Sequence, residues 1–469
     1  MTEKKASIAK GSIFIGRKDE LDFFEHLYSL EECSICSLKG RRRVGKTTLL
    51  AKFCEGKRHL FFRCRTTLDS NLDHIALELS EKSGITRGPF KNLESALKSV
   101  MDYCSEEKTV VIFDEYPHLA KCNKAAPSIF QHFLDQMKDL NSMIVLCGSS
   151  ISAMNALQTE RNPIFGRIQY RRTLDQLSFE ECSELHPDMP IIDQMKLYLT
   201  VGGYPKYQIV MRENSYRECV STHFFGRYSD LDGESEVILT SEISPRERVL
   251  AVAEAVGVGK TTMKEISDRS GYATSLCRTT LASLKQIGVI DTVKLVFMGK
   301  AKPQYTMVDG IVGFQYLVMD KIDDITSNEH PLETFDSRYD DISTYLGFRF
   351  ERYCAEYIQR NYVTRSIGKW YRTIDGETED VDIIAEVTDG KNRITLFCEC
   401  KFRSKPTSYA VLDTLRRRVD IIGSSKNERY VIFSASEFSD SLVEAAEHDP
   451  RIILIDMDML AGRKPAPKL

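Results

Sequence analysis

The sequence has no excess of positive charge and no long apolar run. Its 64 lysine and arginine residues are outnumbered by 68 aspartate and glutamate residues, which gives a formal net charge of −4. This balance excludes a uniformly basic nucleic-acid coat, so any DNA contact must come from local patches. No stretch approaches the roughly 20 apolar residues that span a bilayer, and the polar residues 1–12 lack the apolar core of a signal peptide. We therefore expect a cytoplasmic protein without membrane contact.

The cysteines also lack the spacing of zinc ligands. The chain has 13 cysteines, but only Cys33 and Cys36 form a CxxC pair, and Cys398 and Cys400 lie two residues apart. A structural zinc site needs four ligands, and no second pair stands at the required distance. We expect reduced thiols that pack as small apolar side chains.

Short apolar runs alternate with helical stretches from about Gly11 to Tyr170. The runs are Ser34–Leu38, His59–Cys64, Thr109–Phe113, Met143–Cys147 and Ile168–Tyr170. Continuous apolar strands separated by helices are typical of a parallel sheet that is covered on both faces. This part of the chain is therefore predicted to be an α/β domain, and the length of 469 residues leaves room for further domains.

A phosphate-binding motif directly follows the first apolar run. Residues 40–47 fit the pattern GxxxxGK[ST] in full. The predicted nucleotide-binding residues are Gly40, Arg41, Arg42, Arg43, Val44, Gly45, Lys46, Thr47 and Thr48. The two glycines allow backbone amides to point at the phosphates, Lys46 reaches the β and γ oxygens, and Thr47 ligates magnesium. The motif predicts ATP and Mg²⁺ as cofactors.

A second strand ends in two carboxylates, Asp114 and Glu115. Asp114 is predicted to hold the magnesium shell and Glu115 to act on the attacking water, with a solvated turn as the alternative. Ser149, which follows the run Met143–Cys147, is a candidate sensor of the γ-phosphate, or else part of a plain turn. Arg167 is a candidate arginine finger for a neighbouring γ-phosphate, which goes with a homo-oligomer; the alternative is a solvated surface residue.

The residues Val258–Thr262 repeat Val44–Thr48 letter for letter. The pattern requires a glycine at position 254, where the chain has Glu254, and no apolar run precedes the repeat. We therefore predict a loop without nucleotide at this place.

A winged helix-turn-helix is predicted at about 244–308, from two helices around Gly271 and two β-like runs around residues 299–303. Its second helix repeats apolar residues at i, i+4 and i+7, which predicts a buried stripe of Cys277, Leu281 and Leu284. Basic residues decorate the wing and the second helix, namely Lys294, Lys300, Lys302 and Arg278. They fit contacts to DNA phosphates, although winged helices also dock proteins.

Two apolar strands near the C-terminus carry charges. Asp382 interrupts Val381–Ala385, and Glu399 and Lys401 interrupt the run that begins at Thr395. Because strand side chains alternate, Glu399 and Lys401 share a face. A metal held by Asp382 and Glu399, with Lys401 near a scissile phosphate, would explain charges at such apolar positions, and an ion-paired cluster is the alternative. Glu351, on the preceding helix, would complete the site.

Together these motifs resemble the archaeal and bacterial ATPases of the AAA-related STAND group. The matching segments are Phe14–Glu20, Gly40–Thr47, Phe113–Glu115, Gly148–Ser150, Asn162–Arg167 and Gly202–Pro205. The resemblance implies an origin-recognition-like ATPase core with Pro205 in a helical lid near the nucleotide. It also implies a C-terminal domain similar to PD-(D/E)xK restriction endonucleases, in which the family often has Glu where this chain has Asp380.

The predicted organisation is a P-loop ATPase core at 1–173, a helical lid at 174–240, a winged helix-turn-helix at 241–319 and a restriction-endonuclease-like α/β domain at 320–469. The predicted function is ATP hydrolysis coupled to action on DNA, with DNA bound by the last two domains and a metal-dependent nuclease site. The alternative is a regulatory ATPase switch whose C-terminal domains bind protein partners without DNA cleavage.

Overall fold

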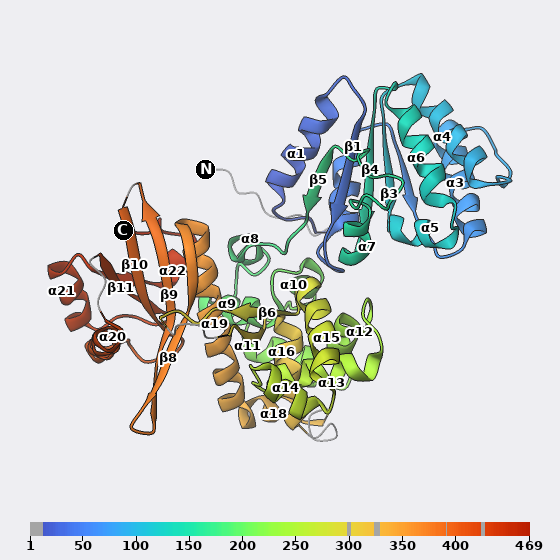
Figure 1. Cartoon of the computed structure of the whole chain (residues 1–469). Helices are drawn as coiled ribbons and strands as arrows, with labels where there is room; N and C mark the ends of the chain where they lie inside the picture. Colours follow the sequence, from blue (N-terminus) through green and yellow to red (C-terminus); the bar gives the residue numbers. More distant parts are fainter. Residues whose placement is uncertain (1–12, 298–301, 323–328, 391, 424–426) are drawn as a thin grey trace. The chain divides into compact units, whose positions relative to one another are not determined.

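The computed structural model describes residues 13–297, 302–322, 329–390, 392–423 and 427–469 (Figure 1). The chain divides into two compact units. The first comprises the described residues up to Glu181 together with Gly203–Ile209, and the second comprises Cys182–Gly202 and the described residues from Val210 to Leu469. Within these described ranges, no helix combines the length and the apolar character that a bilayer crossing requires.

The first unit contains a five-stranded sheet in the order β2-β3-β4-β1-β5, and every neighbouring pair is parallel. The strands are β1 (Ser34–Lys39), β2 (His59–Arg63), β3 (Thr109–Asp114), β4 (Ser142–Gly148) and β5 (Tyr170–Thr173). The helices are α1 (Lys18–Ser29), α2 (Lys46–Cys54), α3 (Leu68–Ser83), α4 (Leu93–Glu106), α5 (Tyr116–Cys122), α6 (Ala126–Met137) and α7 (Ile151–Ala156). The predicted α/β fold is confirmed.

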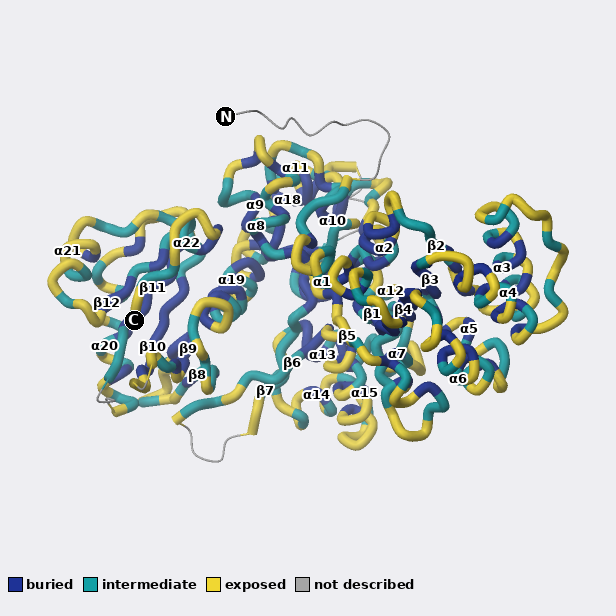
Figure 2. The backbone as a smooth tube through the Cα atoms, turned by 90° about the horizontal axis from the view of Figure 1, so that it is seen from above, coloured by how far each residue is buried: buried dark blue, intermediate teal, exposed yellow. Residues whose placement is uncertain are grey.

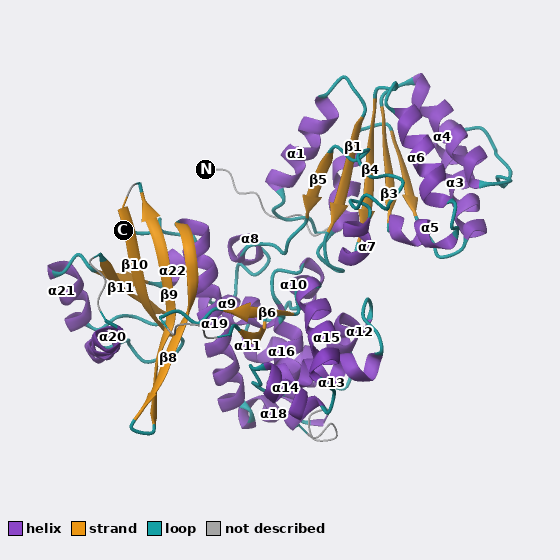
Figure 3. Ribbon diagram, viewed as in Figure 1, coloured by secondary structure: helices purple, strands orange, loops and turns teal. Residues whose placement is uncertain are grey.

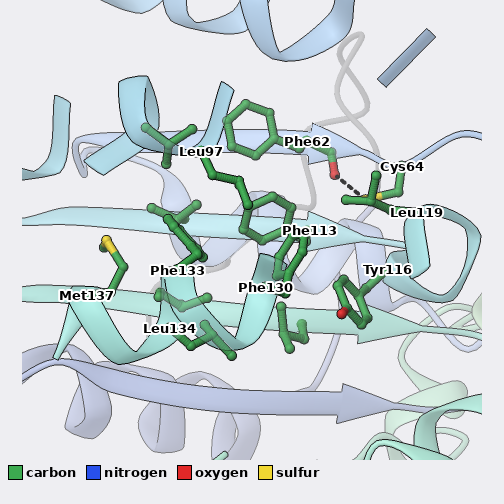
Figure 4. Packing of buried hydrophobic residues seen from close by; sticks show 14 of the residues in the cluster. Phe62, Cys64, Leu97, Phe113, Tyr116, Leu119, Phe130, Phe133, Leu134 and Met137 are labelled. Carbon is green, nitrogen blue, oxygen red and sulfur yellow. Dashed lines mark hydrogen bonds between the residues drawn. The ribbon is translucent and has the colours of Figure 1, made fainter. Parts of the chain in front are cut away.

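The two faces of this sheet are both buried, because helices cover both. Every residue of β3 and β4 is buried (Figure 2). Along β3, Val111 and Phe113 join the core on one face, whereas Val110 and Ile112 join the core on the opposite face. Figure 4 shows Phe113 packed beside Phe130 and Phe133 of α6. This packing holds the carboxyl ends of β1, β3 and β4 at one edge of the sheet.

The second unit begins with short helices and a three-helix group followed by an antiparallel hairpin. The group consists of α13 (Arg246–Gly257), α14 (Met263–Ser270), α15 (Thr274–Gln286), β6 (Ile290–Val293) and β7 (Gln304–Met307). The predicted stripe of Cys277, Leu281 and Leu284 is buried, as expected. Residues 298–301, which include the predicted wing residue Lys300, lie outside the described residues.

Further helical segments connect these parts of the chain. They are α8 (Phe179–Ser183), α9 (Ile191–Val201), α10 (Pro205–Val210), α11 (Tyr216–Val220), the π-helix η1 (Ser221–Phe225), α12 (Glu234–Thr240), α16 (Gly310–Leu317), the 3₁₀ helix η2 (Met319–Lys321) and α18 (Pro331–Ser337).

The C-terminal part of the second unit is a mixed sheet in the order β12-β11-β10-β9-β8. Figure 3 labels four of its strands, β8 to β11. Its strands are β8 (Val363–Ile374), β9 (Glu377–Asp389), β10 (Asn392–Lys401), β11 (Glu428–Ser434) and β12 (Ile452–Ile455). β8, β9 and β10 pair antiparallel, and β10, β11 and β12 pair parallel. The helices are α19 (Tyr339–Asn361), α20 (Tyr409–Ile422), α21 (Asp440–His448) and α22 (Met457–Leu460).

Candidate functional site

The predicted phosphate loop connects β1 to α2, and its conformation depends on glycine. Gly45 has φ 95°, a left-handed backbone that disfavours side chains, and α2 begins at the next residue, Lys46. Lys46 is buried and donates to the carbonyl oxygens of Gly40 (2.7 Å) and Arg41 (3.0 Å). The loop therefore curls around the ammonium group that the motif assigns to the phosphates.

The order of the strands brings the two halves of the site together. β3 ends at Asp114, and the Thr47 hydroxyl donates to the Asp114 carboxylate at 2.7 Å. Asp114 is buried beneath this contact. Hydroxyl and carboxylate oxygens are the ligands that magnesium takes in such sites, so the two residues fit a shared magnesium shell.

Glu115 is held toward Ser149 by a strained backbone. Its φ of 54° is unusual for a residue with a side chain, and such conformations cost roughly 1–3 kcal/mol and cluster at functional sites. Its carboxylate accepts from the Ser149 amide (3.1 Å) and hydroxyl (2.9 Å). Because β4 lies between β1 and β3, Ser149 follows the strand that separates the phosphate loop from Glu115. The structure thus joins two residues that the sequence left as separate candidates.

Pro205 lies beside the phosphate loop, as the family resemblance implied. A Cβ atom built on Gly45 would lie 3.6 Å from the Pro205 ring. Tyr204, next to it, accepts from Arg41 at 2.6 Å and lies under the same guanidinium, 5.1 Å from ring centroid to Arg41 Cζ. Tyr207 contacts Arg43 in the same two ways, at 3.3 Å and 5.4 Å.

The remaining residues of the motif are either buried in the core or exposed to solvent. Val44 is buried in the core below the loop, whereas Arg42 and Thr48 are exposed. The Val44 carbonyl accepts from Arg17 Nη2 at 3.0 Å, and Arg17 is itself buried and paired with Glu20 at 3.1 Å. The sequence analysis placed Arg17 only in a family motif. Its i, i+3 spacing to Glu20 is a local signal of the ion pair alone, not of the contact to Val44.

Arg167 does not reach the phosphate loop of its own chain. It lies three residues before β5 begins at Tyr170, at the amino ends of the parallel strands, whereas the phosphate loop follows a carboxyl end. Its guanidinium pairs with Asp135 of α6 at 3.0 Å and donates to the Phe165 carbonyl at 3.0 Å. The ion pair lowers the pKa of Asp135.

In the second unit, the sheet register brings the predicted metal ligands to one face. Ile383 is opposite Cys398, so Asp382 of β9 is next to Glu399 of β10. Both acids are buried, and Lys401 contacts Glu399 at 2.5 Å. The predicted common face of Glu399 and Lys401 is confirmed.

Burial raises the pKa of both acids. It raises the pKa of Glu399 to about 7; the charge of Asp382 adds to the rise, while Lys401 and Arg418 oppose it. Burial also raises the pKa of Asp382, whose carboxylate accepts from the Cys400 amide at 2.8 Å. Two buried acids that disfavour each other's charge fit a site for a divalent cation, because such a cation would relieve their repulsion.

Glu351 is turned toward a different partner. It forms an ion pair with Lys369 of β8, and burial raises its pKa although Lys369 acts to lower it. Asp380 is half exposed and pairs with Arg418 at 3.3 Å. Across the described residues, no three His, Cys, Asp or Glu side chains are gathered as a ready metal cluster. The donor set that fits a metal is therefore Asp382 and Glu399, with Glu351 held nearby by Lys369.

The candidate DNA-binding residues that the structure describes are exposed. Arg278 of α15, Lys294 and Lys302 present their side chains to solvent. Lys285, in contrast, pairs with Asp291 of β6 at 2.8 Å and ties α15 to the hairpin.

Two family models match parts of the chain. Residues 14–210 match a family described as an ATPase domain predominantly from Archaea, and residues 314–411 match a family of archaeal and bacterial proteins of unknown function. An uncharacterised protein of Methanocaldococcus jannaschii is 23% identical over 444 residues, which cover 89% of this chain and 94% of that protein. An uncharacterised ATP-binding protein of the same organism is 46% identical over 46 residues, or 10% of this chain and 78% of that protein. A solved Walker-type ATPase of Pyrococcus abyssi gives a TM-score of 0.49 at 18% identity and covers 66% of this chain and 98% of its own.

Proposed function

The chain belongs to the ATPase family found predominantly in Archaea, and from this we propose that it hydrolyses ATP to act on DNA. The observation that carries the proposal is the pair of contacts at one edge of the sheet, Thr47 to Asp114 and Glu115 to Ser149. Within the proposal, residues 1–173 form the ATPase core, 174–240 the lid, 241–319 a winged helix and 320–469 a nuclease-like domain.

Each residue at the nucleotide site has a separate task in this proposal. Lys46 exchanges its contacts with two loop carbonyls for phosphate oxygens. Thr47 and Asp114 would hold magnesium, whose positive charge would neutralise charge on the phosphates. Glu115 orients the attacking water, and Ser149 keeps its carboxylate in place until the water is bound. Pro205 and its neighbouring tyrosines couple the loop to the lid.

Action on DNA is proposed for the second unit. The exposed Arg278, Lys294 and Lys302 support phosphate contacts by the winged helix. The buried Asp382 and Glu399 support a metal-dependent site for phosphodiester cleavage, in which Lys401 offsets charge on the scissile phosphate. Glu351 assists from α19.

A second candidate function rests on the ion pairs in the same cluster. Glu399 is paired with Lys401 and Arg418, and Glu351 with Lys369, so these charges are satisfied without a metal. Such pairing favours a regulatory ATPase whose second unit binds partners and cuts nothing.

ATP turnover with and without DNA separates the two candidates. Stimulation of hydrolysis by duplex or single-stranded DNA is expected for the first function, and equal turnover for the second. A nuclease assay with magnesium or manganese completes the test, with Asp382→Ala as the variant that must lose any cleavage seen.

A further inference from the structure

A cavity of about 680 Å³ opens beside the candidate metal ligands. The hairpin β6–β7 forms one wall, and α19 and β8 form the other. Asp382 and Glu351 both line this cavity, and so does Lys369, the partner of Glu351. Asp382, one of the two acids proposed to hold the metal, thus faces this cavity together with Glu351.

The hairpin closes one side of the cavity by pairing with the C-terminal sheet. Leu295 is bridged to Lys369 of β8. The Lys369 amide donates to the Lys294 carbonyl, and the Val296 amide donates to the Lys369 carbonyl, both at 2.9 Å. A Cβ atom on Gly368 would lie 2.5 Å from the Lys294 carbonyl oxygen, so this approach requires glycine. Backbone hydrogen bonds therefore bar a duplex from passing through this side.

Two cations at the wall of the cavity are left available for an anionic ligand. The side chains of Lys294 and Arg365 line the cavity and are exposed, and neither has an ion pair within the described parts of the chain. The deeper cations are occupied: Arg349 donates to the carbonyls of Leu199 and Val308, and Arg352 pairs with Glu356. Available cations in a cavity that is also lined by the buried Asp382 and by Glu351 match the binding of a phosphodiester beside a metal.

We propose that this cavity binds an unpaired strand of DNA and delivers its backbone to Asp382, whose neighbour on the adjacent strand is Glu399. The inference rests on the proposed nuclease function and names its substrate class. The cavity volume equals that of a cube about 9 Å on an edge. A B-DNA duplex is wider than this, because its two grooves alone are about 8.5 and 7.5 Å deep. A single strand or a flap fits this space, and an unbroken duplex does not.

Binding without metal tests the inference independently of cleavage. A fluorescent single-stranded oligonucleotide is titrated in EDTA at several salt concentrations against the full chain and against Lys294→Ala/Arg365→Ala. Each lost phosphate contact lowers the salt slope by about 0.7 for single strands, so the double variant should lose about 1.4. Arg393→Ala, an exposed cation of the same sheet outside the cavity lining, should bind like wild type. Equal affinity and slope in the double variant and wild type would overturn the inference.

Cleavage tests the choice of substrate. With magnesium or manganese, we expect cutting of single strands and flaps, and at least tenfold slower cutting of a relaxed, covalently closed duplex circle. Equal rates on the circle and the single strand would overturn the inference while leaving the nuclease function intact. No cleavage of any substrate, together with the expected loss of binding in the double variant, would refute the nuclease function and support the strand-binding cavity. An oligoribonucleotide that binds better than DNA would overturn the choice of DNA.

Discussion

At the scale of single residues, the duplicated Val-Gly-Lys-Thr-Thr segment provides an internal control. Lys46→Ala is expected to abolish ATP binding, because Lys46 is the cation that the loop curls around. Lys260→Ala changes the same letter in a loop between α13 and α14 and should leave ATP affinity unchanged. Calorimetric titration of both variants measures the difference. Wild-type affinity in Lys46→Ala would refute the assigned nucleotide site.

Variants of Glu115 and Ser149 can distinguish ATP binding from ATP hydrolysis. Glu115→Gln should bind ATP as wild type does but hydrolyse it about 10²–10⁴-fold more slowly, because we propose that the carboxylate acts on the water and not on the phosphates. Ser149→Ala removes one of the two donors to this carboxylate and should have a smaller effect, since the backbone amide remains. Single-turnover hydrolysis under saturating ATP measures both. A Glu115→Gln variant with undiminished turnover would show that another group orients the water.

Residues of the nucleotide site were predictable where they form a continuous sequence motif. Gly40 to Thr47 and the pair Asp114–Glu115 carry their signal locally, since a strand must deliver them directly into a loop. The contact from Arg17 to the Val44 carbonyl spans 27 residues and has no local counterpart. Lys369 and Arg418 were missed for the same reason, because each becomes a partner of a predicted acid only through sheet and helix packing.

At the scale of elements, the segment Gly203–Ile209 packs so closely against the core that one methyl group should disturb it. A Cβ atom on Gly203 would lie 1.9 Å from the Leu177 carbonyl oxygen, which is backbone and cannot rotate away. Gly203→Ala is therefore expected to destabilise the protein by about 1–3 kcal/mol and to weaken ATP binding, because Pro205 and Tyr204 would shift from the loop. Gly88→Ala, where a Cβ meets nothing within 4 Å, is the matched control. Equal thermal midpoints for the two variants would contradict this account.

DNA binding by the exposed cations of the predicted winged helix can be tested separately from DNA binding by the cavity. Arg278→Ala/Lys302→Ala removes two exposed cations that do not line it. If these cations contact duplex phosphates, the salt slope of duplex binding should fall by about 0.9 for each lost contact. Fluorescence anisotropy with a short duplex measures the slope. An unchanged slope would assign these cations to protein docking instead.

Helices and strands were predictable from the spacing of their apolar residues, but the strands with which they pair were not. The stripe of α15 is buried as its spacing predicted, and four strands of the first sheet begin within one residue of the predicted runs. β5 begins two residues later than predicted, at Tyr170, because pairing with β1 rather than local hydrophobicity defines it. The bridge between Leu295 and Lys369 joins positions 74 residues apart, and no periodic signal encodes such a pairing.

At the scale of the whole molecule, each compact unit contains a set of candidate cation ligands, and the two sets are built in different ways. In the first unit, Thr47 and Asp114 already contact each other and would receive magnesium together with the nucleotide. In the second unit, Asp382 and Glu399 are buried side by side, and burial raises the pKa of both. Because the two sets lie in separate compact units, a substitution in one should leave the chemistry of the other intact.

Asp382→Ala gives the most direct test of whether the two sites work independently. It should abolish metal-dependent DNA cleavage while ATP hydrolysis in the absence of DNA stays within twofold of wild type. Asp389→Ala removes an exposed carboxylate from the end of the same strand and should retain both activities. Cleavage that persists in Asp382→Ala would mean that the cutting site lies elsewhere. Loss of ATP hydrolysis in Asp382→Ala, with the protein still folded by circular dichroism, would mean that the nucleotide site depends on the second unit, because Asp382 belongs to that unit and Lys46 to the first.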